Sequence, residues 1–585
     1  MTAPVRLTAG PLRLDYDSGD LRAIRLGDLE IVRRIYVVFQ DRNWTARPWI
    51  IEDEAIDAGA DRFRISLRAR GTFDASDFTW SAEITGDVDG TLRYAMRGAT
   101  GTPFLRNRLG LCVLHPMDGF ADRECTITAP DGSTAASAFP DAISPHQPFR
   151  DIRAMEYPGT PGTLVRVAFD GDTFETEDHR NWSDASYKTY CTPISLPFPV
   201  EVQPSDEIAQ SVTVTVDGEA PDIVVAPEFV TIEVAEATVP VPAIGTQATD
   251  FPWTDDEIAA VRALSLDHLM VTVTDDADPV EALRQAAGIA QATGTRLRVR
   301  FANVDDYASL RDVVRDIAPL ADSWMVIRAD EKVTSAASLG AAQDVLGHDL
   351  PWSAGTDRYF TEVNRMPPDT AGLAWLSFGL NPQVHAADDR SILQNTASQE
   401  LIARNAQRIA GNARIAVGPI SLRPRYNPNA TDPSADPSNT PLPSSVDARQ
   451  RTWVGAAWTA LSLRGLAQAG TIDAVTYFEA LGWRGLRERD AGSADPAAFP
   501  SRPGEEFPVY ALLRDLVSYD RVHPTRSDQP EVADALVVAG SGRTRAFVVN
   551  LSAHRHTVVL TGAMSATIEA DPSSLHVIDL PGRPA

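Results

Sequence analysis

The first part of the chain alternates apolar and polar residues in short runs that are separated by Gly, Asp and Pro. Residues 62–67, 163–169 and 210–216 show this alternation clearly. A period of two is typical of strands that bury one face, and few windows here have the period of a helix. The pattern therefore predicts that residues 1–235 form a large antiparallel β-sandwich.

From about residue 236 the pattern changes, and runs rich in β-branched residues alternate with windows rich in Ala, Leu and Arg. Such βα alternation is typical of a parallel sheet closed by crossover helices. We expect residues 236–520 to form a central (β/α)₈ TIM barrel that carries the active site. The predicted strands are residues 241–245, 269–274, 297–301, 324–328, 352–356, 373–378, 415–418 and 474–478, and the predicted helices include 255–264, 279–293, 307–317 and 447–468.

Two further segments complete the predicted organisation. Residues 533–580 alternate again, which predicts a small C-terminal β-domain over residues 521–585. Residues 423–446 are rich in Pro, Asn, Asp and Ser and follow the seventh predicted barrel strand. Long loops of this kind are usually functional or disordered, and this one is expected at the carboxyl end of the barrel, where active sites lie.

Composition excludes several classes of partner. The chain has 53 Lys and Arg against 80 Asp and Glu, a net charge of −27, which repels phosphate backbones and anionic lipid. No apolar run approaches the length of a membrane span, and no secretory signal is visible. We therefore expect a cytoplasmic protein that binds neither nucleic acid nor membrane; the sequence indicates no oligomeric state.

The motifs of common cofactor and metal sites are also missing. The three cysteines, Cys112, Cys125 and Cys191, lack the spacing of a zinc site or a disulfide framework. There is no P-loop, G-x-G-x-x-G, H-E-x-x-H or G-x-S-x-G motif. No cofactor and no metal are expected.

Two glutamates stand out by their position. Glu362 follows the fifth predicted barrel strand, and Glu479 ends the eighth. Carboxylates at these strand ends point into the barrel mouth, and this spacing lets two carboxyl groups converge on one bond, as in many retaining glycosidases. We expect them to face each other at roughly 5 to 9 Å. The alternative is ordinary loop carboxylates paired with Arg365 and Arg484.

Other polar and aromatic residues are expected at the same end of the barrel. Asn381 and His385 follow the sixth strand, where a histidine could polarise a carbonyl or hydroxyl group. Trp483 could supply an apolar wall for a sugar ring, and Arg484 follows it directly. The alternatives are a satisfied loop histidine and a tryptophan that only packs.

The β-rich half contains one run, residues 174–190, that is unusually dense in polar and aromatic groups. Within it Asp178, Arg180 and Lys188 are candidate substrate-binding residues, and we expect the run to face the barrel mouth. Lys188 is one of only two lysines in the chain, which indicates a need for a compact ammonium group. The apolar run at residues 106–116 delivers His115 at its end in the same way. The alternative is a solvated strand with its salt bridges.

These two runs, together with residues 359–365, 381–385 and 477–485, resemble the D-apionate lactonase family. The most specific stretch is Glu177-Asp178-x-Arg180-Asn181-Trp182, and the resemblance covers nearly the whole chain. It implies an N-terminal β-domain, a TIM barrel and a C-terminal β-domain. It also implies the opening of D-apionolactone to D-apionate in bacterial apiose catabolism, but no assignment of catalytic residues.

The barrel chemistry is compatible with this resemblance. A sugar lactone is planar at its carbonyl carbon and mimics the flattened transition state that glycosidases stabilise. The leading hypothesis is a lactonase, a carboxylic ester hydrolase acting on a small sugar lactone: one glutamate activates water, the other protonates the ring oxygen, and Arg484 or His385 holds the oxyanion. The alternatives are a retaining glycoside hydrolase acting on a small glycoside and, less favoured, a carbohydrate-binding protein.

Overall fold

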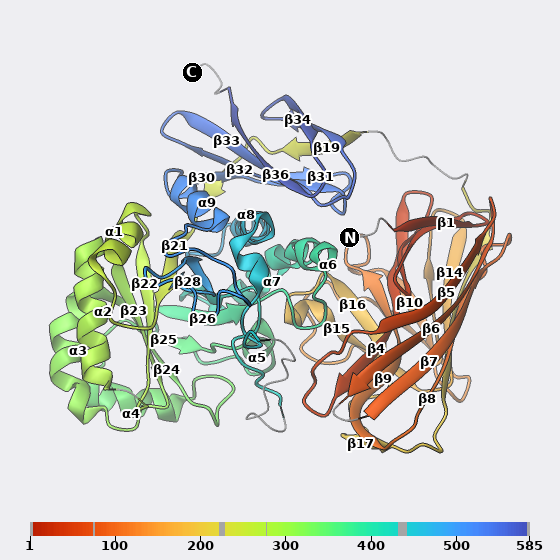
Figure 1. Ribbon diagram of the computed structural model, residues 1–585, viewed down its shortest axis with the longest axis horizontal. Helices are drawn as coiled ribbons and strands as arrows, with labels where there is room; N and C mark the ends of the chain where they lie inside the picture. The colour runs from red at the N-terminus through yellow and green to blue at the C-terminus, as the bar shows by residue number, and fades with distance from the viewer. Residues whose placement is uncertain (1–3, 74–75, 222–228, 277, 431–440, 582–585) are drawn as a thin grey trace. The chain divides into compact units, whose positions relative to one another are not determined.

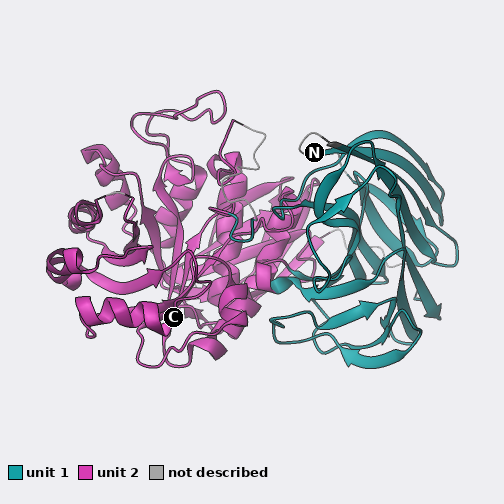
Figure 2. Cartoon of the chain, turned by 90° about the horizontal axis from the view of Figure 1, so that it is seen from below, with its two compact units in different colours: residues 1–180, 185–226, 427–437 teal, residues 181–184, 227–426, 438–585 magenta. Residues whose placement is uncertain are grey.

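The computed structural model describes residues 4–73, 76–221, 229–276, 278–430 and 441–581. The chain divides into two compact units, which Figure 2 colours separately. Unit 1 is Met1–Arg180, Ala185–Ala226 and Asn427–Pro437, and unit 2 is Asn181–Asp184, Pro227–Tyr426 and Ser438–Ala585.

Unit 1 contains two antiparallel nine-stranded sheets. Part of each sheet is a run of strands that follow one another in sequence, and the other neighbouring strands come from more distant parts of the chain. The first sheet has the order β1 (Val5–Ala9), β2 (Leu12–Asp17), β3 (Asp20–Leu26), β4 (Leu29–Asp41), β9 (Phe104–Pro116), β16 (Ser186–Tyr190), β15 (Phe174–Asp178) and β12 (Phe149–Ile152), with β17 (Val200–Val202) paired to β9. The second has the order β11 (Thr134–Ala138), β10 (Glu124–Thr128), β13 (Ala154–Pro158), β14 (Thr163–Asp170), β18 (Ile208–Gly218), β8 (Leu92–Thr100), β7 (Ser76–Gly86), β6 (Phe63–Phe73) and β5 (Ile50–Ala58).

The two sheets share one hydrophobic core. Leu111 of the first sheet and Val165 and Val214 of the second belong to it, and all three are fully buried. Two buried tyrosines also connect the sheets: Tyr94 Oη donates to the Gly19 carbonyl at 2.7 Å, and Tyr157 Oη donates to the Ile31 carbonyl at 2.9 Å. Because alternate residues of both sheets are buried against each other, unit 1 is the predicted β-sandwich.

The parallel barrel lies in unit 2, and all eight predicted strands are present (Figure 1). Pairing of the first strand with the last closes the sheet. The strands are β21 (Ala243–Ala248), β22 (His268–Val273), β23 (Arg296–Ala302), β24 (Ala321–Ile327), β25 (Trp352–Gly355), β26 (Trp375–Leu380), β27 (Arg414–Ile420) and β28 (Ala474–Leu481), and β29 (Gly485–Arg487) pairs beside β28. The predicted TIM barrel is therefore confirmed.

Local signals start and stop the helices of the barrel. Thr254 caps the first helix in a reciprocal capping box with Glu257, and Asp278 caps the second, which ends at Gly294 with a φ of 75°. The α-helices are α1 (Asp255–Ala263), α2 (Pro279–Thr293), α3 (Arg311–Ile317), α4 (Ala336–Leu346), α5 (Phe360–Arg365), α6 (Asp389–Gln394), α7 (Gln399–Ala410), α8 (Trp453–Gln468) and α9 (Pro508–Leu516). The 3₁₀ turns are η1 (His179–Trp182), η2 (Ala308–Leu310), η3 (Ala318–Leu320), η4 (Asn395–Ser398) and η5 (Ala448–Arg451). No helix among the described residues is both long and apolar enough to cross a membrane.

Two small sheets form the C-terminal part of unit 2. One has the order β31 (Thr525–Ser527), β19 (Phe229–Val234), β34 (His556–Gly562) and β35 (Ala566–Ala570). The other has the order β20 (Val239–Pro240), β30 (Arg521–His523), β32 (Ala533–Gly540), β33 (Arg543–Asn550) and β36 (Ser574–Leu580).

The strand β19 belongs to a C-terminal sheet and not to the N-terminal sandwich that its position in the sequence suggests. The alternation up to residue 235 assigns it to the N-terminal sandwich, whereas in the structure it pairs in parallel with β34 and buries Val230, Ile232 and Val234 in the C-terminal core. An alternating run fits any sheet with one buried face, so its own pattern does not identify its partner.

Candidate functional site

Glu479 lies near the carboxyl end of β28 and is 6% exposed. Arg484 donates from Nε to its Oε1 at 2.8 Å, and Thr249 donates from Oγ1 to its Oε2 at 3.4 Å. The preceding residue, Phe478, has a φ of 55°, and the pairing with β21 shifts register at this point. Bulky residues rarely adopt this conformation, and such strain concentrates at functional sites. The unusual conformation of Phe478 thus helps to set the direction in which the Glu479 side chain leaves the strand.

Glu362 lies in α5, one short loop after β25, and is 3% exposed. Within the described part of the chain its carboxyl group has no hydrogen-bond or ion-pair partner. Burial raises its pKa, and the more distant charges of Lys332, Arg365 and Arg358 oppose this only in part. A carboxyl group that keeps its proton to higher pH is suited to act as a proton donor.

The short segment Asn181–Asp184 belongs to unit 2, although the sequence on both sides of it belongs to the sandwich. Asp184 receives a 2.7 Å hydrogen bond from Nδ1 of His385 and a 2.8 Å hydrogen bond from Nδ2 of Asn395. Because a carboxylate can only accept, Nδ1 of His385 carries the proton and the ring is fixed in orientation.

The same segment contacts the helix that carries Glu362. Nδ2 of Asn364 donates to Oδ1 of Asn181 at 2.8 Å. The ring of Trp182 lies edge-on to Tyr359, with 5.3 Å between centroids, and the guanidinium of Arg365 lies over its face at 5.5 Å. Part of the predicted polar and aromatic run therefore helps to hold α5.

Asn381 and Trp483, both predicted from the sequence, have partners of their own. Asn381 is buried at the end of β26, where its Oδ1 accepts from the backbone N–H of Gln383 at 3.1 Å. Trp483 donates from Nε1 to Ser493 at 2.9 Å and stacks on Phe499, with 5.8 Å between ring centroids. The contacts of Trp483 fit a packing role.

Asp178 and Arg180 form a fully buried bidentate ion pair, with Arg180 Nε and Nη2 donating at 2.8 and 2.7 Å. Arg180 also donates to the carbonyls of Pro140 and Asp141 and lies over the ring of Tyr187. Since these bonds use most of its donors, the pair has the partners expected of a structural element in the sandwich.

His115 is completely buried among the aromatic side chains of Phe139, Phe120 and Tyr157. Its Nε2 bonds to Thr189 Oγ1 at 2.9 Å, and burial lowers its pKa to about 3. It is therefore a neutral core histidine at physiological pH.

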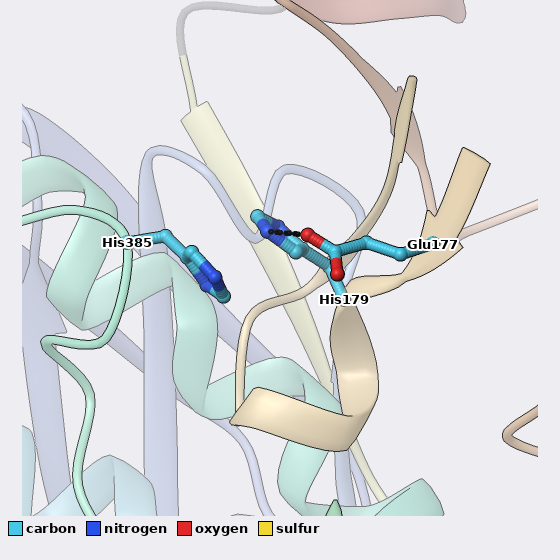
Figure 3. Close-up of side chains that lie close together, drawn as sticks. All are labelled: Glu177, His179 and His385. Atoms are coloured by element: carbon cyan, nitrogen blue, oxygen red, sulfur yellow. Dashed lines mark ion pairs between the residues drawn. The ribbon is translucent and has the colours of Figure 1, made fainter. Parts of the chain in front are cut away.

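One carboxylate oxygen of Glu177 lies close to two nitrogen-bearing side chains of the sandwich. Lys188 Nζ lies 3.4 Å and His179 Nε2 lies 3.5 Å from its Oε1, and Lys188 Nζ lies 5.3 Å from the centre of the Tyr190 ring. Figure 3 shows the ion pair between Glu177 and His179. The compact ammonium group of Lys188 thus lies in a buried setting, 4% exposed, beside a carboxylate and an aromatic ring.

One cluster at the barrel mouth is absent from the sequence-based candidates. Asp357, just after β25, lies between the guanidinium groups of Arg300 and Arg425 and accepts from the hydroxyl of Tyr426. The sequence does contain an indication of this cluster. In β23 the arginines Arg296, Arg298 and Arg300 recur at every second residue of a barrel strand. Residues two apart share a face, so a buried strand with this pattern directs charge into the barrel.

The fold and these residues define a class: a protein with a β-sandwich and a TIM barrel whose ionisable groups gather at the carboxyl ends of the barrel strands. Models of two domains match it, described as the N-terminal domain of D-apionate lactonase over residues 1–219 and its TIM barrel domain over residues 243–521. The chain belongs to the D-apionate lactonase family, which confirms the resemblance seen in the sequence.

Individual proteins are also similar. The chain is 27% identical to a D-apionate lactonase of Brucella anthropi, over 97% of this chain and 96% of that one. Among solved structures, a GH51 arabinofuranosidase from Xanthomonas axonopodis pv. citri shares 12% identity over 60% of this chain and 98% of that chain, with a TM-score of 0.41. An alpha-L-arabinofuranosidase from Thermotoga maritima shares 10% identity over 60% and 95%, also with a TM-score of 0.41. The similarity to these two structures is too low to bear on function.

Proposed function

We propose that this protein is a lactonase that opens a branched sugar lactone, D-apionolactone, to D-apionate in apiose catabolism. The observation that carries the proposal is the family match over residues 1–219 and 243–521. A relative named D-apionate lactonase aligns over 97% of the chain, so the similarity includes all parts of the molecule.

The reaction requires two proton transfers. Water adds to the lactone carbonyl carbon and loses a proton, and the bond between that carbon and the ring oxygen then breaks while the ring oxygen gains a proton. A base and an acid at the reacting carbon accelerate these steps. No external oxidant or reductant is needed, because the carbon stays at the oxidation level of an acid.

Glu362 and Glu479 are proposed for these roles. Glu362 is the acid, since burial raises its pKa and its carboxyl group has no bonding partner in the described chain. Glu479 is the base, because its carboxylate lies near the carboxyl end of β28 and is held in place by Nε of Arg484, 2.8 Å from its Oε1. We expect the two carboxyl groups roughly 5 to 9 Å apart, the range of two-carboxylate sites.

The test replaces each glutamate by glutamine, which keeps shape and hydrogen bonding but cannot transfer a proton. Glu362→Gln and Glu479→Gln should each lower kcat on D-apionolactone by about 10²–10⁴-fold. Glu281→Gln, in the exposed first turn of α2, is the matched control and should change kcat little.

The same variants decide between the proposal and its alternatives. If both folded variants keep kcat within about threefold of the parent, the glutamate pair is wrong while lactone hydrolysis stands. If the parent protein hydrolyses nitrophenyl glycosides and leaves the lactone intact, the retaining glycoside hydrolase replaces the lactonase. If neither compound class is turned over, a binding protein is favoured.

A further inference from the structure

We define the arginine cluster as Arg300, Arg425, Asp357 and Gln247. Gln247 and Arg300 lie near the carboxyl ends of β21 and β23, and Asp357 and Arg425 lie in the loops that follow β25 and β27. Arg425 donates from Nη2 to Asp357 Oδ2 at 3.0 Å and from Nη1 to Gln247 Oε1 at 3.2 Å. Arg300 Nη2 lies 3.4 Å from the same oxygen of Asp357. Neither proposed catalytic glutamate belongs to this cluster.

Three donors of the cluster make no hydrogen bond within the described part of the chain, and one of them, Nη2 of Arg300, has only its ion-pair contact with Asp357. Arg300 and Gln247 are each 3% exposed, yet Nε and Nη2 of Arg300 and Nε2 of Gln247 have no hydrogen-bond partner among the described residues. Leaving a buried donor unpaired is costly, so such groups require an explanation. All three atoms are donors, and a ligand that satisfies them must therefore present acceptor oxygens.

The charge of the cluster indicates which acceptor. Two guanidinium groups surround a single carboxylate, which leaves one positive charge in excess. The Asp357 carboxylate is already occupied, since it accepts from Arg425 and, through its other oxygen, from Tyr426 at 2.8 Å. Planar guanidinium groups prefer carboxylates and oxyanions. A ligand group with one negative charge on oxygen, such as a carboxylate or an oxyanion, would neutralise the excess positive charge of the cluster.

The cluster adjoins the proposed chemistry. Gln247 is the direct cross-strand partner of Glu479 in the pairing of β21 with β28. The amide that lacks an acceptor is thus one strand from the proposed base. Barrel enzymes bind and transform substrates at this end of the strands.

We propose that the arginine cluster binds the acyl oxygen of the substrate: the carbonyl oxygen of the lactone, the oxyanion that forms from it, and the carboxylate of the aldonate product. The assignment rests on the proposed lactonase function. Arg300 supplies the charge, Gln247 supplies a neutral donor, and Asp357 and Arg425 hold both in place.

The test measures binding rather than turnover, by titration calorimetry with D-apionate and with its neutral amide. The parent protein should prefer the carboxylate by about tenfold or more, since bonds between charged groups are stronger than neutral ones. Arg300→Met should abolish this preference. Gln247→Leu should weaken binding of both compounds, because it removes a donor and no charge.

Arg298→Met is the matched control, since Arg298 is equally buried two residues earlier on β23 and pairs with Asp322. It should keep the preference. The proposal is overturned if folded Arg300→Met keeps the preference within threefold, if Arg298→Met loses it equally, or if the parent does not bind D-apionate. Where Arg300→Met does not fold, Gln247→Leu decides, and unchanged binding overturns the proposal. Because the experiment measures binding and not turnover, its result can be interpreted even if the catalytic assignment of the two glutamates is wrong.

Discussion

At the scale of single residues, burial shifts the pKa values of acidic and basic side chains in opposite directions. Burial raises the pKa of Glu362 and lowers the pKa of His115 to about 3, because in both cases it penalises the charged form. The two groups differ in what surrounds them: the carboxyl group is next to a barrel strand end, whereas the imidazole lies in an aromatic core. The same physical effect thus favours the protonated carboxyl group that we propose as the acid in one case and a neutral core imidazole in the other.

The charge of Lys332 should set the position of the alkaline limb of the pH profile. If Glu362 is the acid, activity falls as pH rises through its pKa, since the proton is then lost. Lys332 is the first of the cations that lower this pKa and is itself exposed. Lys332→Met should therefore raise the pKa and move the alkaline limb of kcat/KM to higher pH, as measured on D-apionolactone.

Lys332→Arg keeps the charge and is the control for this experiment. The alkaline limb of its kcat/KM profile should lie at the same pH as that of the parent. Added salt should screen the charge and reduce the difference between Lys332→Met and the parent. A limb that stays in place in Lys332→Met, or one that moves to lower pH, would show that another group sets it.

His115 should make the sandwich sensitive to acid. Its pKa is about 3 when folded against an ordinary value near 6.5, so the unfolded chain binds a proton more readily. The stability this histidine contributes is present above about pH 6.5 and is lost as pH falls toward 3. His115→Gln should thus lower the free energy of unfolding at pH 7 but reduce its further loss between pH 6.5 and 4.

Urea unfolding monitored by near-ultraviolet circular dichroism at several pH values measures this effect. His146→Gln is the control, because His146 is exposed and should leave the pH dependence unchanged. If the free energy of unfolding falls equally at acid pH in His115→Gln and in the parent, other groups cause the acid sensitivity. Buried His268, with a pKa of about 4, is then the first candidate.

At the scale of elements, the barrel could be predicted because its signals are local. Each strand is a short apolar run, and caps such as Thr254 and Asp278 precede their helices directly. The helix α2 coincides with its predicted range, residues 279–293. The six-residue helix α5 is too short to show a period, so Glu362 could be assigned to a strand end and not to a helix.

The candidate site was harder to predict, because side-chain partners come from distant sequence. Asp178 and Arg180 look like a ligand-binding pair in the sequence, but their partners at Pro140 and Asp141 are provided by a loop some forty residues earlier. Arg300 and Asp357 come together only when β23 and β25 take their places in the barrel. Residue type and spacing indicate which groups can react, whereas tertiary pairing decides which are already occupied.

At the scale of the whole molecule, the order of the chain and the order of its structural units differ. The strand β19 precedes the barrel in sequence but belongs to a sheet completed by β31 and β34, about 300 residues later. Ile232 of this strand is fully buried in the C-terminal core. Ile232→Ala should therefore destabilise that sheet by about 2–5 kcal/mol, the usual cost of removing a buried isoleucine side chain.

Amide hydrogen exchange on the full chain locates the effect, since local opening raises exchange only in the elements that lose support. Exchange should accelerate in β31 and β34 of Ile232→Ala and stay unchanged in β6 and β7 of the sandwich. Glu233→Ala, on the exposed face of the same strand, should change neither. Faster exchange confined to the sandwich would instead show that residues 229–234 stabilise the N-terminal sheets, as the alternation of the sequence suggests.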